Sequence, residues 1–168
     1  MFQYECSCCG KVHEGVPSFG YDAPAPFREQ PLEAQQAGFL DSDLCRYEDA
    51  DGEHYFIRVC LEVPINGLEE PFVWGVWSSL SKLNFERYVD TYQSPDTTDC
   101  YFGWLCNRLP CYPDTYAMKL NVHVRSVGTR PYVVPEESDH PLSIDFHQGI
   151  TSERAVEIAE HLLHASDA

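Results

Sequence analysis

The sequence predicts an α+β fold with a mainly antiparallel sheet and helices packed on it. Two observations predict this class. Several short runs alternate apolar and polar residues and are joined by turn residues, which is typical of antiparallel strands. Other runs carry apolar residues at helical spacing and are inserted between the strands rather than alternating with them one for one. With 168 residues, of which 43% are hydrophobic, the chain can bury one core, so we expect a single domain over residues 1–168.

The first part of the chain is expected to be irregular, over residues 1–30. Four prolines lie between residues 17 and 31, and proline extends neither a helix nor a central strand. The sheet and the helices are expected in residues 31–168. They begin with a short helix over residues 32–39 and a strand over residues 44–47.

Residues 56–63 form the clearest strand of the sequence. Apolar residues occupy every second position of it: Ile57, Val59, Leu61 and Val63. An Asn-Gly turn then leads to the expected antiparallel partner, residues 72–77. The alternation places Trp74 and Trp77 on opposite faces of the sheet. Because large aromatic side chains usually build core, we expect both of them and Trp104 to be buried.

Two longer helices are expected in the second half of the chain. One begins after Ser81 and stops before Pro95, and the other begins after Thr151, since a serine or threonine hydroxyl caps a helix N-terminus well. A polar loop is expected over residues 95–100. Four further strands are expected over residues 101–105, 116–124, 132–134 and 142–146.

The charge of the chain restricts its partners. Lys and Arg number 11 against 27 Asp and Glu, for a formal net charge of −16. Such a chain repels nucleic-acid phosphates and anionic membranes, so we expect no nucleic-acid partner and a basic protein as the possible partner. No apolar run approaches the length of a membrane span, and no export segment is recognisable. We therefore expect a cytoplasmic protein whose eight cysteines are reduced.

The stretch closest to chemistry is a Cys-x-x-Cys-Gly motif near the N-terminus. Cys6 and Cys9 are three positions apart, Gly10 follows directly, and His13 comes three residues later. Two thiols at this spacing can close a tight turn around one metal ion, and the glycine relieves strain in the turn. The motif predicts a knuckle that supplies two of the four ligands of a zinc ion. A metal-free turn and a redox-active thiol pair are the alternatives.

Several short motifs occur along the chain in a fixed order. They are Cys6-x-x-Cys9-Gly10-x-x-His13, Asp43-x-Cys45, Phe56-Ile57-Arg58, Trp74-Gly75-Val76-Trp77-Ser78-Ser79-Leu80-Ser81, Phe102-Gly103-Trp104-Leu105 and Arg130-Pro131. With them the chain resembles, over nearly its whole length, the bacterial domain of unknown function 2199 family. The resemblance implies a small bacterial cytosolic protein and no activity that can be assigned to a residue.

The remaining zinc ligands are chosen with the help of this resemblance. No second Cys-x-x-Cys motif is present, so the other two ligands must be scattered along the chain. His13 and Cys45 are the expected ligands, because both lie in motifs shared with the family. The competing residues are Cys8, His54, Cys60, Cys100, Cys106 and Cys111.

Two other groups have a structural and a functional interpretation. His161 and His164 are three positions apart near the C-terminus and could share an ion, but the helix dipole alone favours histidine in a last helical turn. Arg58 lies in the middle of a strand with Glu62 on the same face. An ion pair between them is the expected arrangement, and substrate binding by Arg58 is the alternative.

The sequence favours a protein that works by contact over an enzyme. Signatures of common hydrolases, nucleotide-binding proteins and metalloproteases are absent. The leading hypothesis is a non-enzymatic protein-interaction or regulatory module with a structural zinc site and an acidic surface. An immunity protein, which binds and neutralises a toxin, is one example of such a module. The alternative is a small metal- or thiol-dependent enzyme with its site around Cys6, Cys9 and His13. The oligomeric state is left open.

Overall fold

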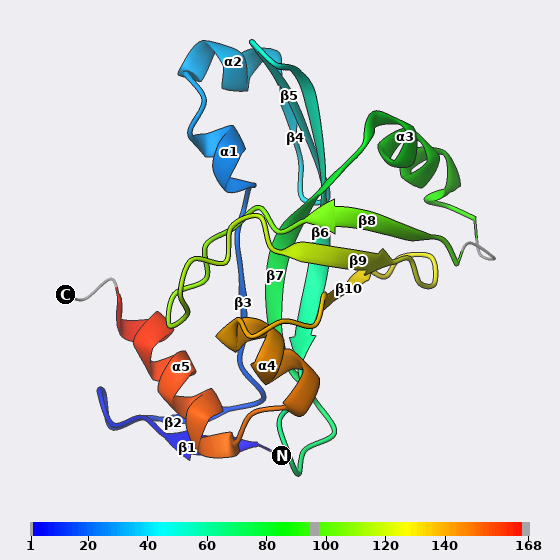
Figure 1. Cartoon of the computed structure of the whole chain (residues 1–168). Coiled ribbons are helices and arrows are strands. Elements are labelled where there is room, and N and C mark those ends of the chain that lie inside the picture. Colours follow the sequence, from blue (N-terminus) through cyan, green and yellow to red (C-terminus); the bar gives the residue numbers. More distant parts are fainter. Residues whose placement is uncertain (1, 95–97, 166–168) are drawn as a thin grey trace.

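A computed structural model describes residues 2–94 and 98–165 (Figure 1). The strands of these residues are β1 (Gln3–Glu5), β2 (Val12–Glu14), β3 (Ser18–Gly20), β4 (Phe39–Leu40), β5 (Leu44–Asp49), β6 (Gly52–Val63), β7 (Phe72–Leu80), β8 (Cys100–Trp104), β9 (Lys119–His123) and β10 (Tyr132–Pro135). The helices are α1 (Ala25–Arg28), α2 (Leu32–Ala37), α3 (Lys82–Thr91), α4 (Pro141–Gln148) and α5 (Ser152–His164). The predicted α+β class is confirmed. The predicted polar loop includes residues 95–97, which lie outside the described residues.

The main sheet has eight strands and coils strongly. Its central order is β3-β7-β6-β10-β9-β8, while β5 also pairs with β6, and β4 pairs with β5. The pairs β3–β7 and β6–β10 are parallel and the other pairs are antiparallel, which confirms the mainly antiparallel prediction. The sheet curls until the end of β8 returns to β7, where Ser78 and Leu105 form a bridge. The coil therefore has an inner and an outer face.

Most of the core lies on the inner face. Val59 and Leu61 of β6 are fully buried there, and they share a cluster with Phe85 of α3, Leu142 of α4 and Ile158 of α5. Fully burying a side chain of this size stabilises the fold by about 1.5–3 kcal/mol. The three helices thus cover one face of the sheet.

A second, smaller cluster covers part of the outer face. It contains Trp77, Phe56 and Cys45, with Phe27 of α1 packed over them. Trp74 lies in the inner cluster, so the predicted opposition of Trp74 and Trp77 is confirmed. The expectation of burial is wrong for Trp104, which is 42% exposed on β8.

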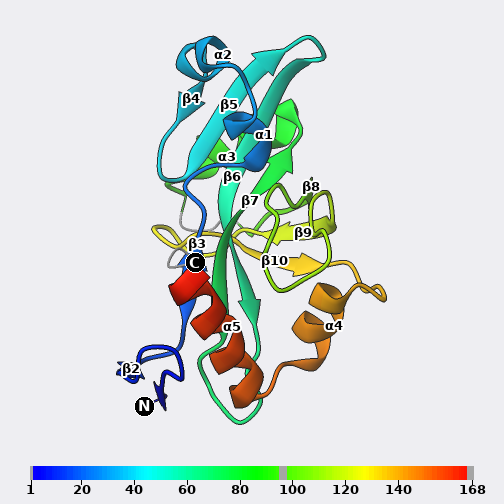
Figure 2. The same ribbon diagram turned by 90° about the vertical axis from the view of Figure 1, so that its left-hand side faces the viewer.

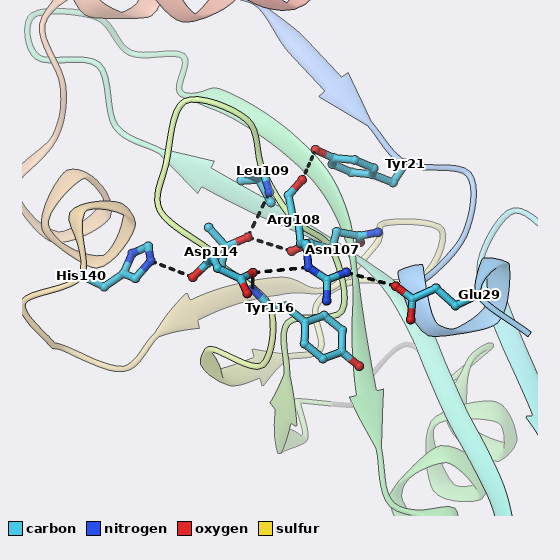
Figure 3. A network of polar contacts seen from close by, with 9 residues as sticks. Tyr21, Glu29, Asn107, Arg108, Leu109, Asp114, Tyr116 and His140 are labelled. Atoms are coloured by element: carbon cyan, nitrogen blue, oxygen red, sulfur yellow. Dashed lines mark hydrogen bonds and ion pairs between the residues drawn. The ribbon is translucent and has the colours of Figure 1, made fainter. Parts of the chain in front are cut away.

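Buried polar side chains hold the long loop between β8 and β9 (Figure 3). Oδ1 of Asn107 accepts a hydrogen bond from the backbone N–H of Trp77 at 2.8 Å, and its Nδ2 donates to the carbonyl of Ala23 at 3.0 Å. Thr115 Oγ1 donates to the carbonyl of Asn107 at 2.8 Å. The loop is therefore fixed to β7 and to the segment before α1, because buried polar groups need such partners.

The surface part of the same loop joins two other segments. The guanidinium of Arg108 pairs with Glu29 at 3.1 Å and with Asp114 at 3.5 Å, and the carbonyl of Arg108 accepts a hydrogen bond from Tyr21 (Figure 3). The side chain of His140 lies 3.1 Å from the carbonyl of Asp114. These contacts are exposed, so each contributes little to stability.

Residues 142–146 are helical, and the predicted strand there is wrong. Pro141 occupies the first helical turn, where its missing N–H costs nothing, and the side chain of His140 accepts a hydrogen bond from the N–H of Leu142 at 3.1 Å. Gly149 follows the helix with a φ of 80°. The apolar residues at 142, 144 and 146 alternate as in a strand, but those at 142 and 146 are also about one helical turn apart. The spacing therefore fits a strand and a helix alike.

The first 30 residues contain short elements in place of the expected irregular segment. β1 and β2 form a separate hairpin, β3 adds to the main sheet, and α1 packs on it. Figures 1 and 2 show the hairpin and α5 together at one end of the molecule, and β4, β5 and α2 at the other end. Within the described segments, no helix combines the length and apolar composition that a membrane span requires.

Candidate metal centre

The turn between β1 and β2 forms the predicted knuckle. The backbone N–H of Gly10 donates to the carbonyl of Cys6 at 2.8 Å, and the N–H of Cys6 donates to the carbonyl of Lys11 at 2.8 Å. Gly10 has a φ of 69°, a left-handed conformation that favours glycine. The β1–β2 register pairs Tyr4 with His13, which brings the histidine back beside the turn.

Three predicted ligands meet at this turn. The donor atoms of Cys6, Cys9 and His13 all lie within 4.8 Å of one another, and Sγ of Cys9 is 3.7 Å from Nε2 of His13. Ligands arranged tetrahedrally around zinc are roughly 3.3–3.8 Å apart, from the usual zinc–sulfur and zinc–nitrogen bond lengths. The structure thus brings together a group of residues that could hold a metal ion.

A fourth donor comes from the opposite end of the chain. Nε2 of His164, in the last turn of α5, lies 3.1 Å from Sγ of Cys6. Cys6, Cys8 and His164 form a second group whose donor atoms are all within 4.8 Å of one another. Cys6 is common to both groups. The knuckle and α5 therefore offer two overlapping groups of three donors, and His164 is grouped with neither Cys9 nor His13.

A carboxylate holds α5 against the knuckle. The side chain of Glu160 accepts hydrogen bonds from the backbone N–H and the hydroxyl of Ser7, both at 2.7 Å. Glu160 and His164 are four positions apart and therefore lie on one face of α5, whereas His161 is exposed. The buried Ile158 packs into the core, which sets the rotation of the helix.

The local electrostatics favour a thiolate at Cys6. Burial raises the pKa of Cys6, but backbone N–H groups of Cys9 and Cys8 and the side chains of His164 and Cys9 lower it to about 6. Burial raises the pKa of Cys8 instead. The two hydrogen bonds from Ser7 lower the pKa of Glu160. Since the thiolate is the form that ligates metals, the turn prepares Cys6 for that role.

Cys45 is not part of this group, and its selection from sequence needs correction. Its side chain is fully buried in the second cluster, and the β5–β6 register pairs it with Phe56. β5 lies at the end of the molecule opposite the knuckle (Figures 1 and 2). No metal-ligand group in residues 2–94 and 98–165 includes Cys45.

The competing residues also lie elsewhere, apart from Cys8. His54 contacts Asp49 at 2.8 Å, and Cys106 is buried in the second cluster. The position of His164 in the last turn of α5 is also the one that the helix dipole favours, so its sequence context does not single it out as a ligand. No local pattern shows that α5 returns to the N-terminus.

The fold and the donor group define a class of protein, namely a mixed-sheet α+β protein whose chain ends meet at a candidate metal centre. A family model described as "Uncharacterized protein conserved in bacteria (DUF2199)" matches residues 5–150, and the chain belongs to this family. The family resemblance seen in the sequence motifs is thereby confirmed. The matched range includes Cys6, Cys9 and His13 and ends before α5. No curated protein and no solved structure matches the chain.

Proposed function

We propose that the protein binds one zinc ion through Cys6, Cys9, His13 and His164, and that this ion has a structural role. The proposal is carried by two groups of donors that share Cys6, one with Cys9 and His13 in the knuckle and one with Cys8 and His164 of α5. Because His164 is grouped with neither Cys9 nor His13, the four-ligand site requires these side chains to draw together around the ion. Two thiolates and two imidazoles suit zinc better than magnesium or calcium, which prefer oxygen ligands. The ion joins residues 6 and 164, so it ties the N-terminal hairpin to the C-terminal helix.

A structural role is favoured over a catalytic one by the number of donors. A zinc ion with four protein ligands has no open position for water or substrate. Five surface hollows in the described part of the molecule are lined by other residues, and none of these five includes a proposed ligand. The hairpin β1–β2 has three residues in each strand, and an isolated hairpin is marginal in water. The ion supplies the missing support.

The module held in this way is suited to contact with another protein. The net charge of −16 favours a basic protein partner and disfavours nucleic acid. We therefore keep a non-enzymatic interaction or regulatory role as the function. A salt-sensitive capture by a basic protein, reproduced with the purified pair, is the expected behaviour.

One observation supports the enzymatic alternative. Sγ of Cys6 and Nε2 of His164 are 3.1 Å apart, which is the separation of a thiol nucleophile and its base. If the site held no metal, or held it through three ligands, this pair would be the candidate catalytic group. Metal content and coordination distinguish the two functions.

The decisive experiment measures zinc per chain by native mass spectrometry, on protein purified without a metal-binding tag. We expect one zinc in the parent protein and none in Cys6→Ser or His164→Ala. His161→Ala is the matched control, because it removes an exposed imidazole from the same helix, and it should retain the ion. Cys45→Ala should retain it as well. A parent protein without zinc, or a His164→Ala variant that keeps it, contradicts the four-ligand site.

Cobalt(II) in place of zinc tests whether the site is closed. Two thiolates and two imidazoles should give the intense visible bands of tetrahedral cobalt, and added azide should leave them unchanged, because no coordination position is free. A spectrum that shifts with azide indicates an open position and supports the enzyme.

A further inference from the structure

Arg58 is a charged side chain without the partner that the sequence predicted. It lies half-buried in the middle of β6, on the outer face of the sheet, opposite Trp77 of β7. Glu62, its expected partner, pairs instead with Arg125 at 2.9 Å, so the predicted ion pair is wrong. In the described part of the chain, the buried Nε of Arg58 has no hydrogen-bond partner. An arginine keeps its charge at any ordinary pH, so an acceptor is missing.

Two glycines form a floor under the guanidinium. Gly20 of β3 and Gly75 of β7 are paired in the parallel register, and Figure 1 shows β3, β7 and β6 side by side. A Cβ on Gly20 would lie 2.6 Å from an Nη of Arg58, and one on Gly75 would lie 3.3 Å from it. Any other residue at Gly20 would displace the guanidinium. Gly20 ends β3 and Gly75 lies within β7, and the missing side chains of both leave room for the guanidinium above the backbone.

The two carboxylates considered as partners of Arg58 each pair with another arginine. Asp43 pairs with Arg130 at 2.8 Å, as Glu62 does with Arg125. Burial raises the pKa of Asp43, but the contacts with Arg130 and Ser42 and the charge of Arg58 lower it, which shows that Arg58 acts on the same carboxylate. Neither ion pair includes Arg58.

We propose that Arg58, laid over Gly20 and Gly75, anchors a binding site for a carboxylate ligand. The planar fork of a guanidinium matches the two oxygens of a carboxylate. A single guanidinium carries one positive charge, which a carboxylate monoanion neutralises and a phosphate dianion exceeds. The site lies on β3, β7 and β6, and its residues do not include any proposed zinc ligand, so it goes beyond the metal function.

The test is a titration followed through the Nε–H signals of the arginine side chains by ¹H–¹⁵N NMR. The probes are sodium acetate and sodium benzoate, with sodium chloride at equal ionic strength and sodium phosphate as comparisons. The Arg58 signal should shift saturably with both carboxylates, and Arg58→Gln should weaken binding at least about tenfold, as expected when a charged hydrogen-bond donor is lost. Arg87→Gln is the matched control, because it removes an exposed arginine that pairs with Asp99.

A second variant keeps the arginine and moves it. Gly20→Ala places a methyl group against the guanidinium without backbone strain, since Gly20 has no positive φ. We expect binding to weaken about fivefold or more, because the preorganised position of the fork is lost. Ser18→Ala on the same strand is the control and should bind as the parent does. If Arg58→Gln does not fold, the carboxylate affinity of Gly20→Ala tests the proposal, and an affinity equal to that of the parent contradicts it.

Two further probes identify the source of the carboxylate. A short peptide with a free α-carboxylate is compared with the same peptide amidated at its C-terminus. Binding of the free peptide alone points to a partner chain, and binding of acetate or benzoate points to a small molecule. The absence of any saturable shift, a preference for phosphate, or equal binding by Arg58→Gln overturns the proposal.

Discussion

Cys6 of the knuckle and the two cysteines of the second cluster differ in chemistry although all three are shielded from water. Cys6 is 1% exposed, Cys45 is 0% exposed and Cys106 is 3% exposed. Burial raises the pKa of Cys45 and Cys106 to about 12. At Cys6 the backbone N–H groups of a tight turn reverse the effect of burial, and its pKa falls to about 6. At Cys106 a backbone hydrogen bond from Ser79 does not offset burial, whereas at Cys6 several donors act together. The balance between burial and hydrogen-bond donors therefore decides which thiol is prepared for metal binding.

The largest expected difference is in thiol modification of the native, metal-free protein. Iodoacetamide should modify the exposed Cys8 and Cys9 at least about 1000-fold faster than Cys45 and Cys106, because the latter are neutral and react only when the structure opens. Mass spectrometry of peptides gives the rates. In denaturant the modification rates of the four cysteines should become similar. Similar rates in the native protein would contradict the expected difference between the knuckle and the second cluster.

Zinc should then separate two neighbouring thiols. If Cys9 is a ligand and Cys8 is not, added zinc slows modification of Cys9 by about 100-fold or more and leaves that of Cys8 within about threefold, because a bound thiolate is not free to react. The same peptide analysis measures both. Protection of Cys8 with continued reaction of Cys9 would assign the ligand role to Cys8.

A smaller effect is expected on stability. Cys45→Ser buries a hydroxyl among apolar side chains and should lower the free energy of unfolding by about 1–3 kcal/mol. Cys8→Ser is the matched change at an exposed position and should stay within about 0.5 kcal/mol. Urea denaturation of metal-free protein measures both values. A larger loss in Cys8→Ser would mean that the metal-free knuckle already supports the fold.

The smallest effect appears at alkaline pH. Since the pKa of Cys106 rises from 9.0 to about 12 in the fold, the fold favours the neutral thiol. Its contribution is complete below pH 9 and is lost as the pH rises from about 9 toward 12, because the unfolded chain ionises first. Cys106→Ala should therefore lose less stability than the parent between about pH 9 and pH 10. Identical pH dependence of unfolding in the two proteins would contradict this.

Local patterns predicted the elements that depend on near neighbours. The alternation in residues 56–63 corresponds to β6, and the caps Ser81 and Thr151 accept hydrogen bonds at the starts of α3 and α5. Residues 142–146 were wrongly predicted to form a strand because their apolar spacing fits a strand and a helix alike. Only the proline before them and the glycine after them favoured the helix, and these signals were outweighed by the alternation.

The α+β class, the family and the grouping of Cys6, Cys9 and His13 could be predicted from the sequence alone, because they depend on composition, ordered motifs and residues close together in the chain. The contact between Cys6 and His164 depends on the fold, since the two residues are separated by 158 positions. The tertiary structure also decided that Glu62 pairs with Arg125 and leaves Arg58 above two glycines. Contacts of this kind depend on how strands and helices are placed, and no local pattern carries that information.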